Sequence, residues 1–193
     1  LVAIVLPTIA NSIYASVVQA IMDRLAEAGY HTLVGPSGYV PEQEEALLAA
    51  ILGRRPDGIV LTGTFHTQAS RERLSSASIP VVEAWDLSDD GLDMQVGFSH
   101  EQVGAAVAEH FFAKGYRRWA VVGVDDPRAL RRCNAVIGRL AELGVNNVAV
   151  QTLPLPATWE VGRKGLANLL DAGEKLDFIF CSSDTVALGV LAE

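Results

Sequence analysis

Short apolar runs alternate along the chain with longer segments whose apolar residues recur every three or four positions. Residues 1–6 are apolar throughout, as in a strand that is buried on both faces of a sheet. The next segment repeats apolar side chains at helical spacing from Ile13 to Ala28, and Gly29 is suited to end that helix. This alternation predicts strands that each lead into a helix, as in α/β proteins.

The same pattern continues to the end of the chain. Further strands are predicted at residues 31–35, 59–61, 79–82, 94–98, 119–122, 148–153 and 178–181. The first three strands are spaced much like the last three, which indicates two lobes of the same plan. We therefore predict an α/β fold with two lobes, residues 1–101 and 102–193, each a parallel sheet flanked by helices.

Residues 96–123 (VGFSHEQVGAAVAEHFFAKGYRRWAVVG) join the two series of strands and helices. Ser99 and Gln102 form an S-x-x-Q capping box in front of a helical apolar pattern, and Gly115 is suited to end the helix. We predict that this helix carries the chain from one lobe to the other.

Polar residues cluster where the predicted strands end. Ligands of parallel α/β sheets bind outside the carboxyl ends of the strands, so these residues are candidates for a small-molecule site held between the lobes. Free N–H groups at the predicted helix starts near Asn11, Ser99 and Ser183 suit anionic or hydroxyl oxygens. Arg132 can hold a carboxylate through two parallel hydrogen bonds, or pair with Asp125 or Asp126 at the surface.

Aromatic, acidic and histidine side chains at the strand ends are further candidates with structural alternatives. Tyr14 and Trp159 could cover the apolar face of a sugar, or pack in the core and at a helix start respectively. Glu83, together with Asp86, could accept hydroxyl hydrogens or form a solvated edge. His66 is as suited to a ligand contact as to a structural role.

Composition narrows the classes of function. Of the 193 residues, 50% are apolar and 20% are charged, which is enough apolar surface for a core. The net charge of −8 opposes binding of these residues to nucleic acid. Cys133 and Cys181 fit reduced, packed thiols of a cytoplasmic protein. No apolar run is long enough for a membrane span, and the start at Leu1 leads us to expect that an upstream segment has been removed.

The usual enzyme signatures are missing. There is no G-x-G-x-x-G after the first strand, and no G-x-x-x-x-G-K-[ST], H-E-x-x-H or G-x-S-x-G. We therefore expect a protein that is not an enzyme, with no catalytic residues, no metal site and no cofactor.

Several motifs carry a family resemblance. They are the first strand with its continuation into Asn11-Ser12-Ile13-Tyr14, the block at residues 96–123, Arg132 with Ala135, and FCSSDTVALG near the end. With these motifs the whole chain resembles the effector-binding region of LacI/GalR-type bacterial transcription regulators, which share the type I periplasmic-binding-protein fold. Within that family it is most similar to gluconate-operon repressors, through LTGTFHT (61–67), IPVVEAWD (79–86) and LDMQVGFS (92–99).

The resemblance implies a cytoplasmic transcriptional repressor that responds to a sugar or sugar acid, with gluconate as a candidate. This region would dimerise, bind the effector between its lobes and allosterically control operator DNA binding by an N-terminal helix-turn-helix absent from this chain. The family's last strand–helix units would follow Glu193, so the second lobe is expected to be incomplete. The alternative is a periplasmic sugar-binding protein of a transporter, which would have the same fold and no DNA partner.

The resemblance also assigns roles to residues by position. It places Ile13 and Tyr14 in the pocket wall, Gln102 or Ser99 and then Ser183-Asp184 at polar contacts, Arg132 as the anchoring arginine, and Trp159 as an aromatic platform. With Asn11, His66 and Glu83, these are the predicted ligand-binding residues. The family commonly has Asp-Asn where this chain has Ser99-His100, and Asn-Asp in place of Ser183-Asp184, so the hydroxyl contacts of this chain differ from the common pattern.

Overall fold

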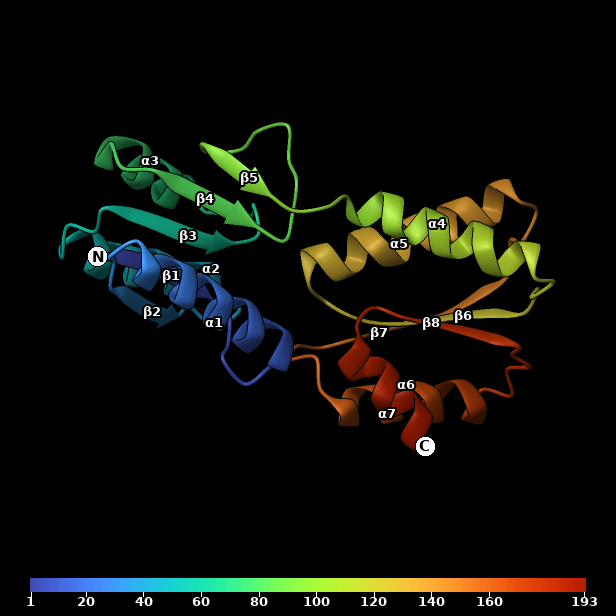
Figure 1. The fold of residues 1–193 in the computed structure, drawn as a ribbon. Coiled ribbons are helices and arrows are strands. Elements are labelled where there is room, and N and C mark those ends of the chain that lie inside the picture. The colour runs from blue at the N-terminus through green and yellow to red at the C-terminus, as the bar shows by residue number, and fades with distance from the viewer. The chain divides into compact units, whose positions relative to one another are not determined.

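Strands and helices alternate along the chain, except that β4 (Val81–Ala84) is followed directly by β5 (Met94–Val96) (Figure 1). The computed structural model describes residues 1–193, which divide into unit 1 (Leu1–Phe98) and unit 2 (Ser99–Glu193). The boundary between the units lies three residues before the boundary predicted between the lobes, which were residues 1–101 and 102–193. The helix that was predicted to carry the chain from one lobe to the other therefore belongs to unit 2.

Unit 1 contains a parallel sheet with the strand order β2-β1-β3-β4-β5. The strands are β1 (Val2–Leu6), β2 (Thr32–Pro36), β3 (Gly58–Thr62), β4 (Val81–Ala84) and β5 (Met94–Val96). The helices are α1 (Ser12–Glu27), α2 (Pro41–Leu52) and α3 (Gln68–Ala77). Because all five strands run in one direction, the loops that follow β1, β3 and β4 start at the same edge of the sheet.

The two faces of this sheet are covered by different helices. Side chains alternate along β1, so Ile4 packs with Val18 of α1, whereas Val5 packs with Leu48 of α2 and Leu74 of α3. Ile13 and Val17 were predicted on the apolar face of α1. The structure instead buries Val18, because the helix turns Ile13 outward, with 52% of its surface exposed.

Unit 2 contains a parallel sheet with the strand order β7-β6-β8. Its strands are β6 (Trp119–Val124), β7 (Val148–Leu153) and β8 (Phe178–Cys181). Its helices are α4 (His100–Ala113), α5 (Pro127–Glu142), α6 (Trp159–Asp171) and α7 (Asp184–Ala192). Strand β6 is buried along its full length and is the centre of this unit.

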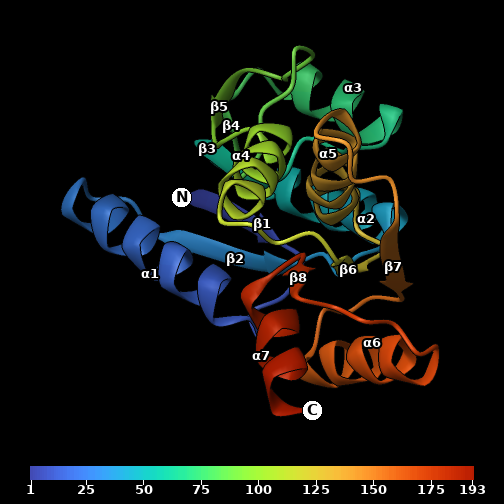
Figure 2. The same cartoon turned by 90° about the vertical axis from the view of Figure 1, so that its right-hand side faces the viewer.

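Paired helices cover the two faces of the second sheet. Helices α4 and α5 lie side by side on one face, where Trp119 and Val121 of β6 pack with Val136 of α5 (Figure 2). Helices α6 and α7 lie on the other face, where Val122 packs with Leu169. None of the seven helices combines the length and apolar character that a bilayer span requires.

Helix boundaries follow the predicted chemistry. Asn11, Ser99, Thr158 and Ser183 each precede a helix and accept a hydrogen bond from a main-chain N–H of its first turn. Gly115 follows α4 with φ of 98°, a left-handed conformation that disfavours any residue with a Cβ atom. These ends fix where the helices start relative to the carboxyl edges of the sheets.

Candidate functional site

The first turn of α1 presents three of the predicted ligand-binding residues at the carboxyl edge of the unit 1 sheet. The Asn11 side chain accepts a hydrogen bond of 3.1 Å from the Ile13 N–H and so caps the helix. Tyr14 follows on the inner side of the helix, where its ring meets that of Trp85 edge to face, with 5.3 Å between centroids. Tyr14 thus lies at the edge of the core rather than inside it, and Ile13 is exposed.

Trp85 lies at the same edge of the sheet and is not among the predicted ligand-binding residues. It follows β4 with φ of 67°, a left-handed conformation that costs a bulky residue roughly 1–3 kcal/mol. Its N–H donates to the Val96 carbonyl oxygen, which secures the strained turn to β5. The motif IPVVEAWD contained Trp85, but only its acidic residues were considered as contacts.

A buried polar cluster lies behind the loop that joins β3 to α3. The two ring nitrogens of His66 face two carboxylates, with Nδ1 2.6 Å from Oε1 of Glu44 and Nε2 3.4 Å from Oε1 of Glu83. Glu83 Oε2 accepts hydrogen bonds from the Leu92 N–H at 2.8 Å and from Gln95 Nε2 at 3.3 Å. The side chains of His66 and Glu83 are both 0% exposed, so in this structure they hold the loops together from inside.

Asp86 makes a second connection between loops of unit 1. Its carboxylate accepts hydrogen bonds from the Thr64 hydroxyl at 3.0 Å and from the Leu87 N–H at 2.8 Å. Gly97 passes so near that an added Cβ would lie 2.3 Å from the Asp86 carbonyl oxygen. Because Asp86 is fully buried, it is not the solvated edge that was one of the two alternatives for this residue.

Arg132 is the centre of the polar groups of unit 2. Its Nε and Nη2 donate to the carbonyl oxygen of Ser182, at 3.2 and 2.6 Å, at the carboxyl end of β8. Its Nη1 lies 2.7 Å from Nδ1 of His100, the first residue of α4. Asp126, one of the two surface partners considered for Arg132, pairs with Arg128.

A close approach of two helices brings His100 and Arg132 together. Gly104 lies one turn after His100, and an added Cβ there would be 2.4 Å from the Arg132 carbonyl oxygen and 2.8 Å from Cβ of Ala135. Only glycine allows α4 and α5 to pack at this distance. The small residues at positions 104 and 135, noted in the sequence only as parts of motifs, thus position the arginine.

The start of α4 is also held by an ion pair. Glu101 pairs with Nε of Arg131 and accepts a hydrogen bond of 2.9 Å from its Nη2. The hydrogen bond from Arg131 lowers the pKa of Glu101 to about 2, so this carboxylate stays charged over the physiological range. The Ser99 hydroxyl caps the helix by accepting from the Gln102 N–H at 3.1 Å, and the Gln102 side chain is exposed.

The remaining candidates lie at the starts of α6 and α7. Trp159 is the first residue of α6 and is 49% exposed. Its carbonyl oxygen would be 1.9 Å from a Cβ on Gly189, so the start of α6 rests on the middle of α7. Ser183 caps α7 by accepting from the Val186 N–H, and Asp184 opens that helix.

The structure thus groups the predicted residues within each unit. In unit 1 it joins the α1 start to Trp85 and, separately, His66 to Glu83. In unit 2, Arg132 contacts Ser182, which precedes Ser183, and His100, which follows Ser99. Trp159 rests on the middle of α7.

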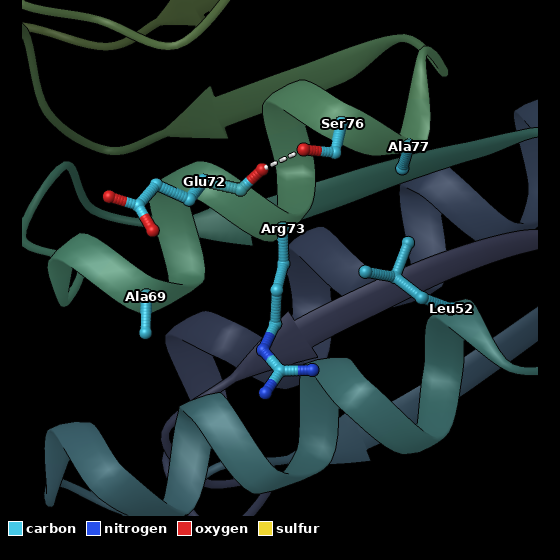
Figure 3. A pocket seen from close by; sticks show the side chains of 6 residues that line it. All are labelled: Leu52, Ala69, Glu72, Arg73, Ser76 and Ala77. Carbon is cyan, nitrogen blue, oxygen red and sulfur yellow. Dashed lines mark hydrogen bonds between the residues drawn. The ribbon is translucent and has the colours of Figure 1, made fainter.

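A shallow surface pocket lies elsewhere, between α2 and α3 (Figure 3). It is lined by Leu52, Ala69, Glu72, Arg73, Ser76 and Ala77, and the Arg73 side chain extends from α3 towards α2. The lining runs along α3 from Ala69 to Ala77 and includes Leu52, the last residue of α2. None of the predicted ligand-binding residues lines this pocket, so it is not part of the candidate site.

Parallel sheets with polar residues and helix starts at their carboxyl edges are typical of α/β domains that bind small molecules. The model of a protein family described as "periplasmic binding protein domain" matches residues 2–193 of this chain. The crystal structure of transcription regulator GntR from Chromobacterium violaceum is similar, with a TM-score of 0.93 and 34% identity over 99% of this chain and 71% of that one. A LacI-family transcriptional regulator from Silicibacter pomeroyi has a TM-score of 0.93 and 32% identity over 99% and 72%.

Curated relatives agree with these structures. The HTH-type transcriptional regulator GntR of Pseudomonas aeruginosa is 33% identical over 100% of this chain, and IdnR of Escherichia coli is 30% identical over 97% of it. The chain belongs to the LacI family of transcriptional regulators, as the sequence motifs predicted. It spans 57% of the length of each of these two relatives.

Proposed function

We propose that this chain is the effector-binding region of a transcriptional repressor and that its effector is a sugar acid, with gluconate as the first candidate. Membership of the LacI family supports a regulatory role. Gluconate is supported by the motifs LTGTFHT, IPVVEAWD and LDMQVGFS and by the similarity to regulators named GntR. The finding that these relatives are regulators disfavours both the transporter-associated alternative and an enzyme.

The observation that carries the sugar-acid proposal is the placement of Arg132. Its guanidinium is held at the carboxyl end of β8, next to the start of α7 at Ser183. A fixed, planar, cationic group of this kind suits a carboxylate, which it can bind through two parallel hydrogen bonds. A neutral sugar offers only hydroxyl groups, and these form weaker hydrogen bonds to a guanidinium.

The remaining candidates suit the hydroxylated carbon chain of such an acid. Helix N–H groups near Ser99 and Ser183 favour hydroxyl and carboxylate oxygens. Aromatic surface from Trp85, Tyr14 and the half-exposed Trp159 suits the C–H faces of a polyol. We propose that the effector takes contacts from these groups, as the family resemblance predicts.

Control of transcription requires parts outside this chain. The net charge of −8 makes these residues a poor surface for DNA, so we propose that a helix-turn-helix of the full-length protein binds the operator. We further propose that this region dimerises and that the effector binds more tightly to the conformation with low operator affinity. A coupling of roughly 1–3 kcal/mol would change operator affinity by about 5–150-fold.

Calorimetric titration tests the choice of effector. D-Gluconate should bind the full-length protein, whereas D-sorbitol, which has the same carbon chain without the carboxylate, should bind at least about tenfold more weakly. The substitution Arg132→Ala should abolish gluconate binding. Arg118→Ala is the matched control, because Arg118 is exposed and paired with Asp177. Equal binding of gluconate and sorbitol would contradict the sugar-acid proposal.

A DNA-binding assay tests the regulatory part. Full-length protein should be released from its operator when gluconate is added, and Arg132→Ala should stay bound. Gluconate should be recovered unchanged after the incubation, since no reaction is proposed. Operator binding that is equal with and without a bound sugar acid would show that the effector does not act as an inducer.

A further inference from the structure

The orientation of the Arg132 side chain is determined by contacts from two other elements. The carbonyl oxygen of Ser182 at the end of β8 accepts hydrogen bonds from Nε and Nη2, which occupy one edge of the guanidinium. Nη1, on the opposite side of the group, contacts His100 at the start of α4. A planar group that is held at both of its sides cannot turn about its long axis, so the directions of its remaining N–H bonds are set as well.

The contact with His100 specifies the protonation of the histidine ring. All nitrogens of a guanidinium are donors, so Nδ1 of His100 must be the acceptor in the 2.7 Å contact. An accepting Nδ1 carries no proton, and the ring is then the neutral tautomer with its proton on Nε2. The contact therefore exists in only one of the three forms that a histidine can take.

The position of the His100 ring is itself fixed by the fold. His100 is 2% exposed and is the first residue of α4, whose start is capped by Ser99. One turn later, Gly104 packs against the main chain of Arg132. The donor, Arg132, and the acceptor, His100, thus lie on two helices, and these cannot move apart without breaking the contact between Gly104 and the Arg132 main chain.

We propose that His100 is a positioning residue for effector binding: in its Nε2–H form it turns the Arg132 guanidinium into the orientation that receives the carboxylate of the effector. The proposal rests on the proposed function, because it assumes that Arg132 binds a sugar acid. Two-point binding of a carboxylate depends on the plane of the guanidinium, so losing the acceptor weakens effector binding although His100 need not touch the effector. The role belongs to the acceptor atom and not to the volume of the ring.

Two substitutions separate the acceptor from the volume. In His100→Asn, the side-chain oxygen replaces Nδ1 as an acceptor at nearly the same distance from the main chain. In His100→Leu, a side chain of similar size fills the site without an acceptor. Gluconate affinity of the full-length protein is measured by calorimetry, and thermal unfolding without ligand is measured for each variant.

The expected result is a split between the two variants. His100→Leu should weaken gluconate binding by about tenfold or more, whereas His100→Asn should stay within about threefold of the wild type. Equal affinities of His100→Leu and the wild type would overturn the positioning role, as would an Asn variant that binds as weakly as the Leu variant. If the wild type binds no sugar acid at all, the proposed function itself is wrong. That outcome is distinct from failure of the positioning role, in which the wild type binds gluconate and the two variants do not differ as expected.

A spectroscopic measurement tests the same arrangement without an effector. Histidine labelled with nitrogen-15 in the full-length protein should show His100 as the Nε2–H tautomer, with an unprotonated Nδ1. Arg132→Ala removes the donor and should relax this preference. A proton on Nδ1 of His100 in the wild type would be incompatible with the contact and would overturn the proposal.

Discussion

Single buried polar side chains hold together loops of unit 1 that are distant in the sequence. Glu83 on β4 meets His66 from the β3–α3 loop and accepts hydrogen bonds from Leu92 and Gln95. The side chains of His66 and Glu83 were removed from water on folding, and the Glu83 carboxylate is the group that meets all three partners. Its role is therefore visible in stability even if no effector touches it.

We expect Glu83→Ala to lower the free energy of unfolding by about 2–4 kcal/mol, because it removes the carboxylate that faces the buried His66 ring and accepts from the Leu92 N–H and Gln95 Nε2. Asp89→Ala is the matched control, since Asp89 is an exposed acid in the next loop, and its change should stay below about 0.5 kcal/mol. Urea unfolding of both variants provides the measurement. Similar midpoints for the two variants would show that the cluster adds no stability.

The two cysteines predict a pH dependence. Burial raises the pKa of both Cys133 and Cys181 to about 11, above the usual value of 9.0. A raised pKa means that the folded state keeps the neutral thiol while the unfolded chain ionises, so this contribution is complete below pH 9.0 and is lost as the pH rises towards 11. The denaturant concentration at the unfolding midpoint should decrease as the pH is raised through this window. The decrease should be smaller in a Cys133→Ala/Cys181→Ala variant.

Labelling with iodoacetamide at pH 8.5 provides a second readout of the same property. The native chain should react far more slowly than the chain in urea, because the thiolate is the reacting species and buried thiols are poorly accessible. Rapid modification of both cysteines in the native protein would contradict the burial that the structure shows.

At the scale of elements, the sequence predicted where strands and helices lie better than which way the helices face. Glycines in left-handed conformations end helices wherever the chain places them, so Gly29 and Gly115 were reliable signals. The face of α1 was predicted only in part, because Ile21 packs against the core beside Val18 whereas Ile13 is exposed. Apolar residues surround much of that helix, and only packing selects among them.

Contacts across the fold were the least predictable part of the candidate site. Arg132 was identified by its motif, but its partners Ser182 and His100 are 50 and 32 residues away in the sequence. The pairing of His66 with Glu83 likewise depends on the register of β3 with β4. Such distances follow from the strand order, which local patterns do not specify.

The close packing of α4 on α5 gives a prediction at the element scale. Gly104→Ala should cost about 1–3 kcal/mol of stability, because the added methyl group would meet the Arg132 carbonyl oxygen, and it should also weaken gluconate binding. Gly138→Ala on α5 is the matched control. A Cβ there meets nothing within 4 Å, so this substitution should stabilise the helix by about 0.5–1 kcal/mol. A neutral Gly104→Ala would contradict the observed helix separation.

At the scale of the whole molecule, each unit has its own sheet and its own core. An effector that binds only the folded protein stabilises it by RT ln(1 + [L]/Kd), which is about 2.7 kcal/mol at a hundredfold excess over Kd. Gluconate should therefore raise the melting temperature of the full-length protein by several degrees. Arg132→Ala should unfold at a temperature that gluconate does not change, and a shift of wild-type size in this variant would exclude Arg132 from the site.

The three tryptophans lie in three different environments, and this gives the protein its own optical reporters. Trp119 is buried in the core of unit 2 and should emit constantly at short wavelength. Trp85 lies in its strained turn against Tyr14, and Trp159 is half exposed at the start of α6. Single-tryptophan variants that keep either Trp85 or Trp159 should therefore show, by a change in fluorescence emission wavelength or intensity, which unit an added sugar acid contacts.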